Sequence, residues 1–268
     1  MTRIVSHANA KVNLTLKITG KRSDGYHDLE SLFLFLPDVY DVLIFDTAVN
    51  FSEKSAKIKG IPDDKNSIKK AASLLKTHFK SPIPHVEIVK NIPTEAGLGG
   101  GSSDAACFIN SVFDFWDIST EKKFEFIQHA KVLGSDAIVF LYKYFLDKDA
   151  LLLKGSGLGG TIEKITLPNL KDSHILIVNN GTKLSTKNVF ETYQENDLEN
   201  ALTQAAIALE PSISNILADI KATNPILCNM SGSGTTCFGI YKSEQKALKA
   251  QTALRKKYEF VKISRGIC

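Results

Sequence analysis

Strict alternation of apolar and polar side chains marks residues 10–18 as a strand. Val12 and Leu14 fall on one side, whereas Lys11 and Asn13 fall on the other. Because successive side chains of a strand point to opposite faces, one face is expected to be buried and the other to be polar. The pattern predicts a half-buried strand that presents Lys11 and Asn13 together.

The rest of the chain alternates short apolar runs with stretches of helical periodicity. Apolar runs predict strands, apolar residues at every third or fourth position predict amphipathic helices, and Gly or Pro marks most breaks. Strands are expected near 32–36, 42–45, 86–89, 175–178, 236–241 and 259–264, with two more around a glycine turn in 149–167, and helices near 68–79, 105–116, 124–132, 197–209, 212–221 and 244–257. Asn66 is placed to cap the first helix. We expect a mixed α+β fold, with one domain over residues 1–155 and a second over 156–268.

Composition places the chain among ordinary globular proteins. Of its 268 residues, 43% are hydrophobic and 23% are charged, so a packed core is expected rather than disorder. The net charge is +4, from 33 basic and 29 acidic residues, and the basic residues are dispersed. This surplus suits an anionic small molecule but is too small and too scattered to predict nucleic-acid binding.

Cysteine spacing and hydropathy restrict the compartment and the chemistry. Cys107, Cys228, Cys237 and Cys268 form no CxxC pair, so neither a zinc site nor a redox motif is expected, and we assign no metal ligands. Buried reduced thiols fit a reducing compartment, and Arg3 is not followed by the apolar stretch of a signal peptide. The longest apolar run is too short to cross a bilayer. The sequence predicts a cytoplasmic protein with no membrane partner.

A glycine-rich segment carries the strongest functional signal. Residues 97–103 read Gly-Leu-Gly-Gly-Gly-Ser-Ser and lead directly into a predicted helix. Glycine lets main-chain amides approach a ligand closely, and the free amides and dipole of a helix start favour an anion. The hydroxyls of Ser102 and Ser103 add donors, so we predict polyphosphate binding. The alternative is a flexible loop with a serine N-cap.

Two common nucleotide motifs do not account for this segment. No Gly-Lys-Ser/Thr stands where the helix begins, which excludes a Walker A loop, and the protein-kinase catalytic-loop signature is absent. Residues 155–160 match the G-x-G-x-x-G dinucleotide pattern, but residues 161–168 read as a strand where that motif requires a helix. We therefore expect a hairpin turn at 155–160.

Four segments resemble, in order and spacing, the GHMP family of small-molecule kinases. They are residues 10–14 with 20–27, 93–103, 133–136 and 231–235, and together they span nearly the whole chain. The resemblance implies a two-lobed architecture, with an N-terminal ribosomal-S5-like α/β domain and a C-terminal ferredoxin-like domain. It also implies transfer of the γ-phosphoryl group of ATP, accompanied by Mg²⁺, to a hydroxyl of a small-molecule substrate by a monomer or homodimer. Residues 20–27 are most similar to members whose substrate carries cytidine diphosphate.

The resemblance implies roles for individual residues. Asp136 matches the base that accepts the hydroxyl proton, and Lys11 matches the cation that keeps this carboxylate ionised. The ATP side comprises Asn66 at the adenine pocket and, around the phosphates, Pro93, Gly97, Leu98, Gly99, Gly100, Gly101, Ser102 and Ser103. Contacts to the second substrate are implied for Asn13, Tyr26, His27 and Thr186, with Tyr26 stacking on cytosine and His27 bonding to its edge.

Structural interpretations of the same residues stay open. Asp136 follows Leu-Gly-Ser and suits a helix N-cap, and Lys11 taken alone reads as a solvated strand lysine. Tyr26 and His27 are also consistent with an aromatic packed beside a turn. A GHMP kinase for another alcohol, or an inactive nucleotide-binding relative, is the alternative function.

Three positions depart from the family pattern. Ala137 and Ile138 replace the usual Val-Pro after the aspartate, which changes the local backbone requirement. Glu95 stands in the glycine segment where some members have glycine, so its carboxylate is expected to point away from the phosphates.

Overall fold

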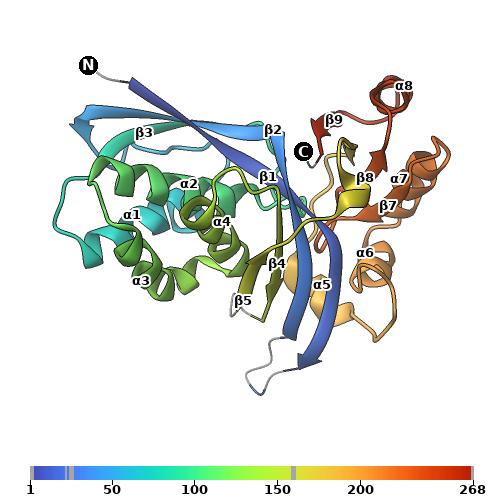
Figure 1. Ribbon diagram of the computed structural model, residues 1–268, viewed down its shortest axis with the longest axis horizontal. Helices are drawn as coiled ribbons and strands as arrows, with labels where there is room; N and C mark the ends of the chain where they lie inside the picture. Colours follow the sequence, from blue (N-terminus) through green and yellow to red (C-terminus); the bar gives the residue numbers. More distant parts are fainter. Residues whose placement is uncertain (1–2, 22, 24–26, 158–160, 267–268) are drawn as a thin grey trace. The chain divides into compact units, whose positions relative to one another are not determined.

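Two compact units make up the computed structural model, which describes residues 3–21, 23, 27–157 and 161–266 (Figure 1). Unit 1 contains residues 1–10, 40–92 and 99–150, and unit 2 contains residues 11–39, 93–98 and 151–268. The chain therefore changes unit five times. The domain boundary at 155/156 stays a prediction, and the compact units follow another division because two long N-terminal strands contribute to both.

These strands are β1 (Arg3–Lys21) and β2 (His27–Asn50). The prediction of separate strands at 32–36 and 42–45 is wrong, because β2 continues through Pro37. Residues 30–34 of β2 pair with β4, and residues 42–46 pair with β3, so Pro37 lies between the two pairings. Neither of these two described pairings uses the N–H that proline lacks.

Unit 1 packs helices against its part of the sheet. Strand β3 (Pro84–Val89) pairs with β2 in antiparallel register, and the helices are α1 (Ser67–His78), α2 (Gly100–Phe115), α3 (Thr120–Ala130) and α4 (Ser135–Leu146). Short 3₁₀ turns cover residues 63–65 and 131–133. Phe45 of β2 lies parallel to Phe108 of α2, and both side chains are fully buried. Burial of such rings is the main stabilising contribution to this core.

The predicted N-cap of α1 is confirmed. The side-chain oxygen of Asn66 accepts hydrogen bonds from the amides of Ile68 and Lys69, at 3.0 and 3.2 Å. These bonds satisfy two of the amides that have no partner within the helix, which fixes where α1 begins.

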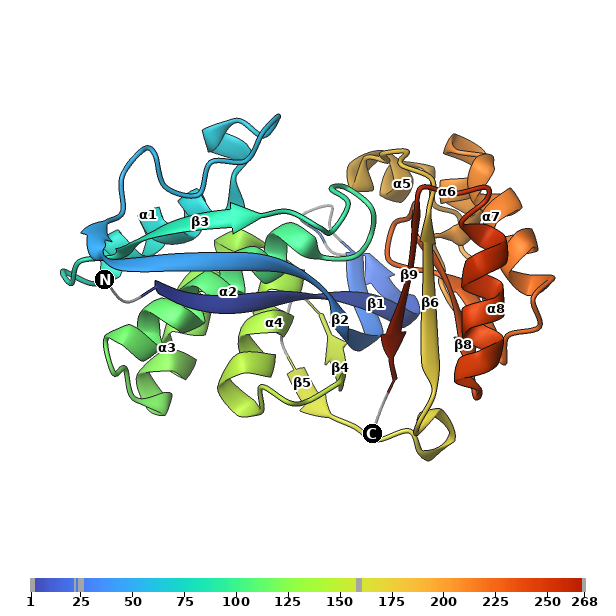
Figure 2. The same ribbon diagram turned by 90° about the horizontal axis from the view of Figure 1, so that it is seen from above.

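Unit 2 contains a second, antiparallel sheet with the order β7-β8-β6-β9. Its strands are β6 (His174–Asn179), β7 (Leu227–Met230), β8 (Cys237–Tyr241) and β9 (Phe260–Arg265), and its helices are α5 (Thr186–Thr192), α6 (Thr203–Leu209), α7 (Ser212–Lys221) and α8 (Glu244–Leu254). Helices α7 and α8 lie on the same side of this sheet (Figure 2). The chain order β6-α7-β7-β8-α8-β9 is the expected ferredoxin-like arrangement.

The other sheet has the order β1-β2-β4-β5, with β3 paired to β2. In unit 2, β4 (Leu152–Ser156) and β5 (Thr161–Lys164) form an antiparallel hairpin. The strand after residue 160 confirms that the G-x-G-x-x-G pattern is not followed by a helix, and residues 158–160 themselves lie outside the described part of the chain.

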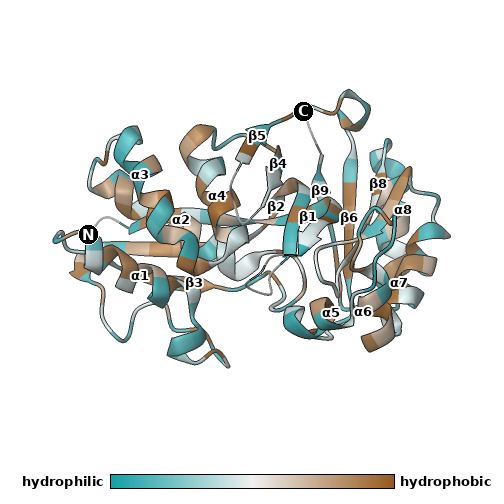
Figure 3. Ribbon diagram, turned by 90° about the horizontal axis from the view of Figure 1, so that it is seen from below, coloured by the Kyte–Doolittle hydropathy of each residue, from teal (hydrophilic) through white to brown (hydrophobic). Residues whose placement is uncertain are grey.

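Surface helices carry both hydrophobic and hydrophilic residues (Figure 3). Within the described ranges, we find no helix of the length and apolar character that a membrane crossing requires.

A bidentate ion pair in unit 2 generates a stability prediction. Asp38 of β2 accepts bonds from the guanidinium of Arg265 in β9, at 2.9 and 3.0 Å, and from the Arg265 amide at 2.9 Å. Partial burial opposes ionisation of Asp38, but the bonds from Arg265 outweigh it and hold the pKa of the carboxyl below its ordinary value.

Asp38→Asn should therefore lower the free energy of unfolding by roughly 1 kcal/mol at pH 7. Since the folded-state pKa is depressed, this contribution is present above the unfolded-state pKa and disappears as the pH falls through the folded-state value. Urea unfolding of both proteins at pH 7 and pH 3 measures it. If the free energies of unfolding of the wild type and the variant differ equally at both pH values, the ion pair is not the source of the difference.

Candidate active site

Lys11 is a buried residue of β1 in unit 2. Its side chain and that of Asn13 are 3% and 2% exposed, and all residues from 10 to 14 are buried. The prediction of a half-buried strand is thus wrong for this stretch, because its polar side chains face protein groups. The ammonium of Lys11 donates to Asn13 Oδ1 at 2.6 Å and to the Gly97 carbonyl at 3.3 Å. It also lies 5.7 Å from the ring centre of Phe33.

The Gly97 carbonyl joins three segments that are distant in sequence. The carbonyl accepts a hydrogen bond from Lys11 and a second one from Ser231 Oγ, at 2.8 Å. The Ser231 hydroxyl in turn accepts a hydrogen bond from the main-chain N–H of Asn13 at 3.1 Å. Gly97 has a φ of 76°, and a Cβ at this position would lie 2.2 Å from the Ser231 carbonyl oxygen. Only glycine permits this approach. Three of the four motifs, residues 10–14, 93–103 and 231–235, therefore meet at the Gly97 carbonyl.

Two buried asparagines brace the C-terminal glycine motif, residues 231–235. Asn200 donates to the carbonyls of Met230 and Gly232, at 2.8 and 2.9 Å. Asn179 donates to the hydroxyls of Thr235 and Thr236, at 2.9 and 3.0 Å. These bonds fix the main chain that contacts Gly97.

An aromatic group surrounds His27 at the start of β2. The His27 ring lies parallel to Phe190 of α5, with centroids 5.5 Å apart, and Tyr193 meets it edge-on at 6.1 Å. Thr186, the first residue of α5, shares a hydrogen bond of 2.9 Å with Ser233. Tyr26 lies outside the described residues, so its stacking role stays a prediction.

The start of α2 belongs to unit 1. Gly99 caps the helix with a φ of 69°, and the Ser103 amide donates to the Gly99 carbonyl at 2.8 Å. Ser102 is half-buried and Ser103 is fully buried. The residues just before this start, 93–98, belong to unit 2. The segment therefore ends in a helix N-terminus, as the anion-site prediction requires.

Asn66 is already engaged by the helix that it caps. Its Oδ1 accepts two amides, and its Nδ2 donates to the Ala56 carbonyl at 2.7 Å. Since an amide group has two N–H donors, one remains for another partner. The adenine-pocket role of Asn66 stays a prediction.

Asp136 is the second residue of α4, not its N-cap. The N-cap position is Gly134, so the capping interpretation of Asp136 is wrong. The half-buried carboxylate lies in the first turn, where the partial positive charge of the helix is favourable. The Ile138 amide donates to the Gly134 carbonyl at 3.4 Å, a bond that the usual proline lacks, and α4 continues unbroken.

Glu95 has a φ of 55° and an exposed side chain. This left-handed conformation is one that glycine adopts readily, which explains why some family members place glycine here.

The predicted site residues thus fall into two groups. Unit 2 brings Lys11, Asn13 and Gly97 into direct contact, and unit 1 holds Asp136, Asn66 and the start of α2. The pairing of Lys11 with Asp136 stays a prediction. Sequence reasoning gave no individual role to several residues that contact the predicted ones. Ser231 and Ser233 had only the signal of their motif, and no signal marked Ser31, Phe33, Phe190 or Tyr193.

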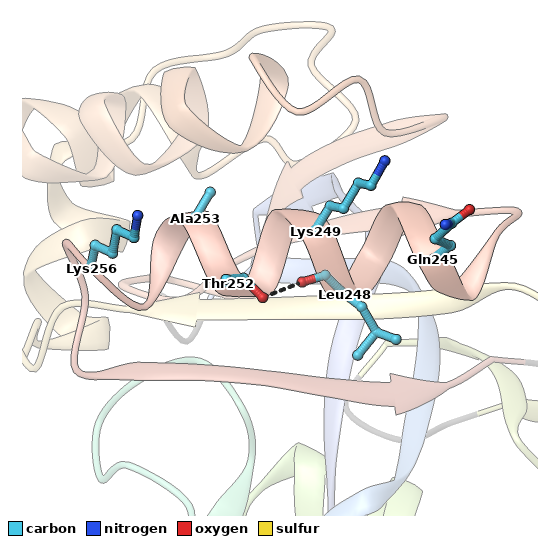
Figure 4. A pocket seen from close by; sticks show the side chains of 6 residues that line it. All are labelled: Gln245, Leu248, Lys249, Thr252, Ala253 and Lys256. Atoms are coloured by element: carbon cyan, nitrogen blue, oxygen red, sulfur yellow. Dashed lines mark hydrogen bonds between the residues drawn. The ribbon is translucent and has the colours of Figure 1, made fainter.

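No group of three or more His, Cys, Asp or Glu residues that could hold a metal occurs in the part of the chain described. A shallow hollow on the outer face of α8 is lined by Gln245, Leu248, Lys249, Thr252, Ala253 and Lys256 (Figure 4). None of these residues is among those predicted for the site.

Comparisons with known proteins agree with this arrangement of motifs. The GHMP kinases N terminal domain matches residues 66–144, and the GHMP kinases C terminal domain matches residues 187–259. Curated 4-diphosphocytidyl-2-C-methyl-D-erythritol kinases from Ehrlichia chaffeensis and Paramagnetospirillum magneticum are 34% and 33% identical to this chain. The first alignment covers 95% of both chains, and the second covers 95% of this chain and 94% of the relative.

The chain belongs to the GHMP kinase family.

Solved structures give the same fold. A 4-(cytidine 5'-diphospho)-2C-methyl-D-erythritol kinase aligns with a TM-score of 0.79 and 25% identity over 98% of each chain. A homoserine kinase from Cytophaga hutchinsonii aligns with a TM-score of 0.63 and 13% identity, over 100% of this chain and 96% of its own. The expected two-domain α+β fold is confirmed, and this GHMP kinase uses ATP as its phosphoryl donor.

The close approach at Gly97 generates a second prediction. Gly97→Ala places a methyl group against the Ser231 main chain, which should destabilise the protein by roughly 2–4 kcal/mol and reduce kcat/KM. Gly157→Ala is the matched control in unit 2, because Gly157 also has a positive φ, 63°, but nothing lies within 4 Å of its added Cβ. The control should lose only about 1 kcal/mol, from the left-handed conformation. Chemical unfolding and a kinase assay compare the two, and equal losses would show that the contact is unimportant.

Proposed function

We propose that this chain transfers the γ-phosphoryl group of ATP to a hydroxyl of 4-diphosphocytidyl-2-C-methyl-D-erythritol. The curated relatives that share about a third of its residues carry this activity in their names. The observation that carries the choice of substrate is the aromatic group of His27, Phe190 and Tyr193 in unit 2.

Flat aromatic surfaces suit a nucleobase. A pyrimidine gains stacking energy on such a ring, and an imidazole edge supplies directional hydrogen bonds that another base would leave unpaired. Tyr26 precedes His27 in sequence, and the family resemblance proposes its ring for the same cytosine pocket. Thr186 and Ser233 offer hydroxyls to the same substrate.

Phosphoryl transfer depends on positioning and charge neutralisation more than on covalent chemistry by the protein. In the proposed mechanism, Asp136 accepts the proton of the substrate hydroxyl. The hydroxyl oxygen attacks the γ-phosphorus at the same time, and ADP leaves. Lys11, oriented by Asn13 and the Gly97 carbonyl, compensates the negative charge on the transferred group. Amides at residues 97–103 bind the phosphates, with Pro93 at the entry of the segment and Asn66 near the adenine.

Magnesium enters this proposal with ATP. We assign the ion no protein ligands, and phosphate oxygens and water would hold it. The ion would neutralise phosphate charge during transfer. Residues Cys107, Cys228 and Cys237 are free thiols, which supports a reducing, cytoplasmic location.

Asp136→Asn should lower kcat by roughly 10²- to 10⁴-fold with little change in either KM, because it removes the proton acceptor and keeps the shape. Glu121→Gln is the matched control, since Glu121 occupies the first turn of α3 in the same unit. Steady-state kinetics with both substrates measures the effect. A loss below about tenfold for Asp136→Asn would assign proton acceptance to another group.

Phe190→Leu should raise the KM for the cytidine substrate by roughly 5- to 150-fold, since it keeps apolar bulk but removes a stacking surface. Tyr26→Ala should act in the same range, and neither should change the KM for ATP by more than about twofold. Equal losses for both substrates together with a lower melting temperature would indicate a structural role instead.

An ADP-release assay across the cytidine-diphosphate substrate, homoserine, mevalonate and a sugar separates the alternatives. Preference for another alcohol would replace the substrate proposal, and ATP binding without turnover on any of them would support an inactive relative.

A further inference from the structure

Strand pairing in unit 1 places Lys90 beside Asp41. The antiparallel register pairs Val42 of β2 with Val89 of β3, so Asp41 and Lys90 are the next residues on the two chains. Because side chains alternate along a strand, Lys90 shares its face with Val86, which is fully buried. Lys90 is therefore directed into the protein, not into solvent.

Its ammonium meets two buried carboxylates. Lys90 Nζ is bonded to Asp41 Oδ2 and lies 2.6 Å from Oδ2 of Asp104, the fifth residue of α2. The side chains of Lys90, Asp41 and Asp104 are 17%, 0% and 1% exposed, so the three charges are almost entirely removed from water. We call these three residues the ionic triad.

The triad holds the chain that enters the glycine segment. Asp41 Oδ1 accepts the amides of Asn91 and Ile92, at 2.5 and 2.9 Å. The chain leaves unit 1 directly after Ile92 and returns to it at residue 99. The ionic triad thus fixes the main chain of residues 91 and 92, directly before residues 93–98.

The chain that leaves the segment lies against the same groups. A Cβ at Gly100, the first residue of α2, would lie 3.0 Å from Ile92 Cγ2 and 3.6 Å from Asp41 Oδ2. Asp104 follows one turn later and is bonded to Lys90. Both ends of the segment are therefore held by one set of charges.

We propose that Lys90, Asp41 and Asp104 are positioning residues for ATP, which clamp the two ends of residues 93–98 so that the amides at the start of α2 keep the geometry that phosphates require. The inference rests on the proposed phosphate-binding role of this segment. None of the three side chains needs to touch ATP, because they act through the main chain of Asn91 and Ile92 and through α2.

The charge balance makes the triad sensitive to the loss of its one cation. Burial raises the pKa of Asp104 to about 7, with Lys90 opposing and Asp41 reinforcing this shift. Burial lowers the pKa of Lys90, but the two carboxylates more than compensate and raise it, so the ammonium stays charged. Asp104 Oδ1 has no hydrogen-bond partner within the described chain, so Lys90 is the main support of this carboxylate. Removing Lys90 alone would leave two buried carboxylates without a counter-ion, which is strongly destabilising.

The informative variant therefore removes the bridge without leaving that charge. In Lys90→Met combined with Asp104→Asn, Asp41 keeps its two main-chain donors, and α2 loses its tie to residues 90–92. Lys123→Met is the matched control, because Lys123 and Asp114 form an ion pair of 2.6 Å between α3 and α2 in the same unit, near the opposite end of α2. Nucleotide affinity by calorimetry, both KM values, kcat and the melting temperature are measured for each protein.

We expect the double variant to weaken ATP binding and raise the KM for ATP by roughly tenfold, while the KM for the alcohol substrate changes less than about twofold. Lys123→Met should keep both KM values despite any loss in melting temperature. A folded double variant with wild-type ATP affinity would overturn the inference. If the double variant does not fold, Asp104→Leu alone decides, since it keeps the Lys90–Asp41 pair but leaves no acceptor on α2 for Lys90, and an unchanged KM for ATP would again overturn the inference. Failure of the wild-type protein to bind ATP would instead contradict the proposed function.

Discussion

The main-chain carbonyl of Gly97 is the point on which the unit 2 part of the site depends. It accepts hydrogen bonds from Lys11 and Ser231, residues that lie 86 and 134 positions away. A carbonyl oxygen has two lone pairs, so both donors can be served without competition. Because the Ser231 main chain approaches so closely, no side chain is tolerated at residue 97. The glycine there is thus needed for packing within the chain as much as for binding any ligand.

Charges that the site requires are held inside the protein, where each needs a partner. Lys11 is buried with Asn13 and Gly97, and Lys90 is buried between Asp41 and Asp104. Removing an ion from water costs several kcal/mol, so such groups keep one geometry as long as their partners are present. Preorganisation of this kind favours a transition state whose charge must be met without rearrangement.

Local features of the fold could be predicted from sequence, and long-range ones could not. The Asn66 cap and the β4–β5 hairpin depend on neighbouring residues, so their patterns were sufficient. The helix predicted at 105–116 begins earlier, at Gly100, because the glycines and serines of the segment form its first turn. The burial of Lys11 was not predictable from alternation, because the groups that its ammonium contacts include the distant Gly97 carbonyl and the Phe33 ring. The break predicted between residues 32–36 and 42–45 was wrong for the same reason. Only the strands that pair with β2 show that Pro37 lies between two pairings, where a missing N–H is tolerated. Phe190 carried no signal at all, because its contact with His27 spans 163 residues.

The repeated exchange of chain between units sets an order for folding during synthesis. Every residue of unit 1 precedes residue 151, whereas unit 2 needs residues 11–39 as well as everything after 150. Leu16 belongs to a core made otherwise of residues from 176 onward and a few neighbours. Once residue 150 has been made, the part of β1 that carries Leu16 waits roughly 6–24 s more for the last strand, at ribosomal rates of about 5–20 residues per second. During that time a finished unit 1 carries two unfinished strands, which makes the nascent chain a natural client for chaperones.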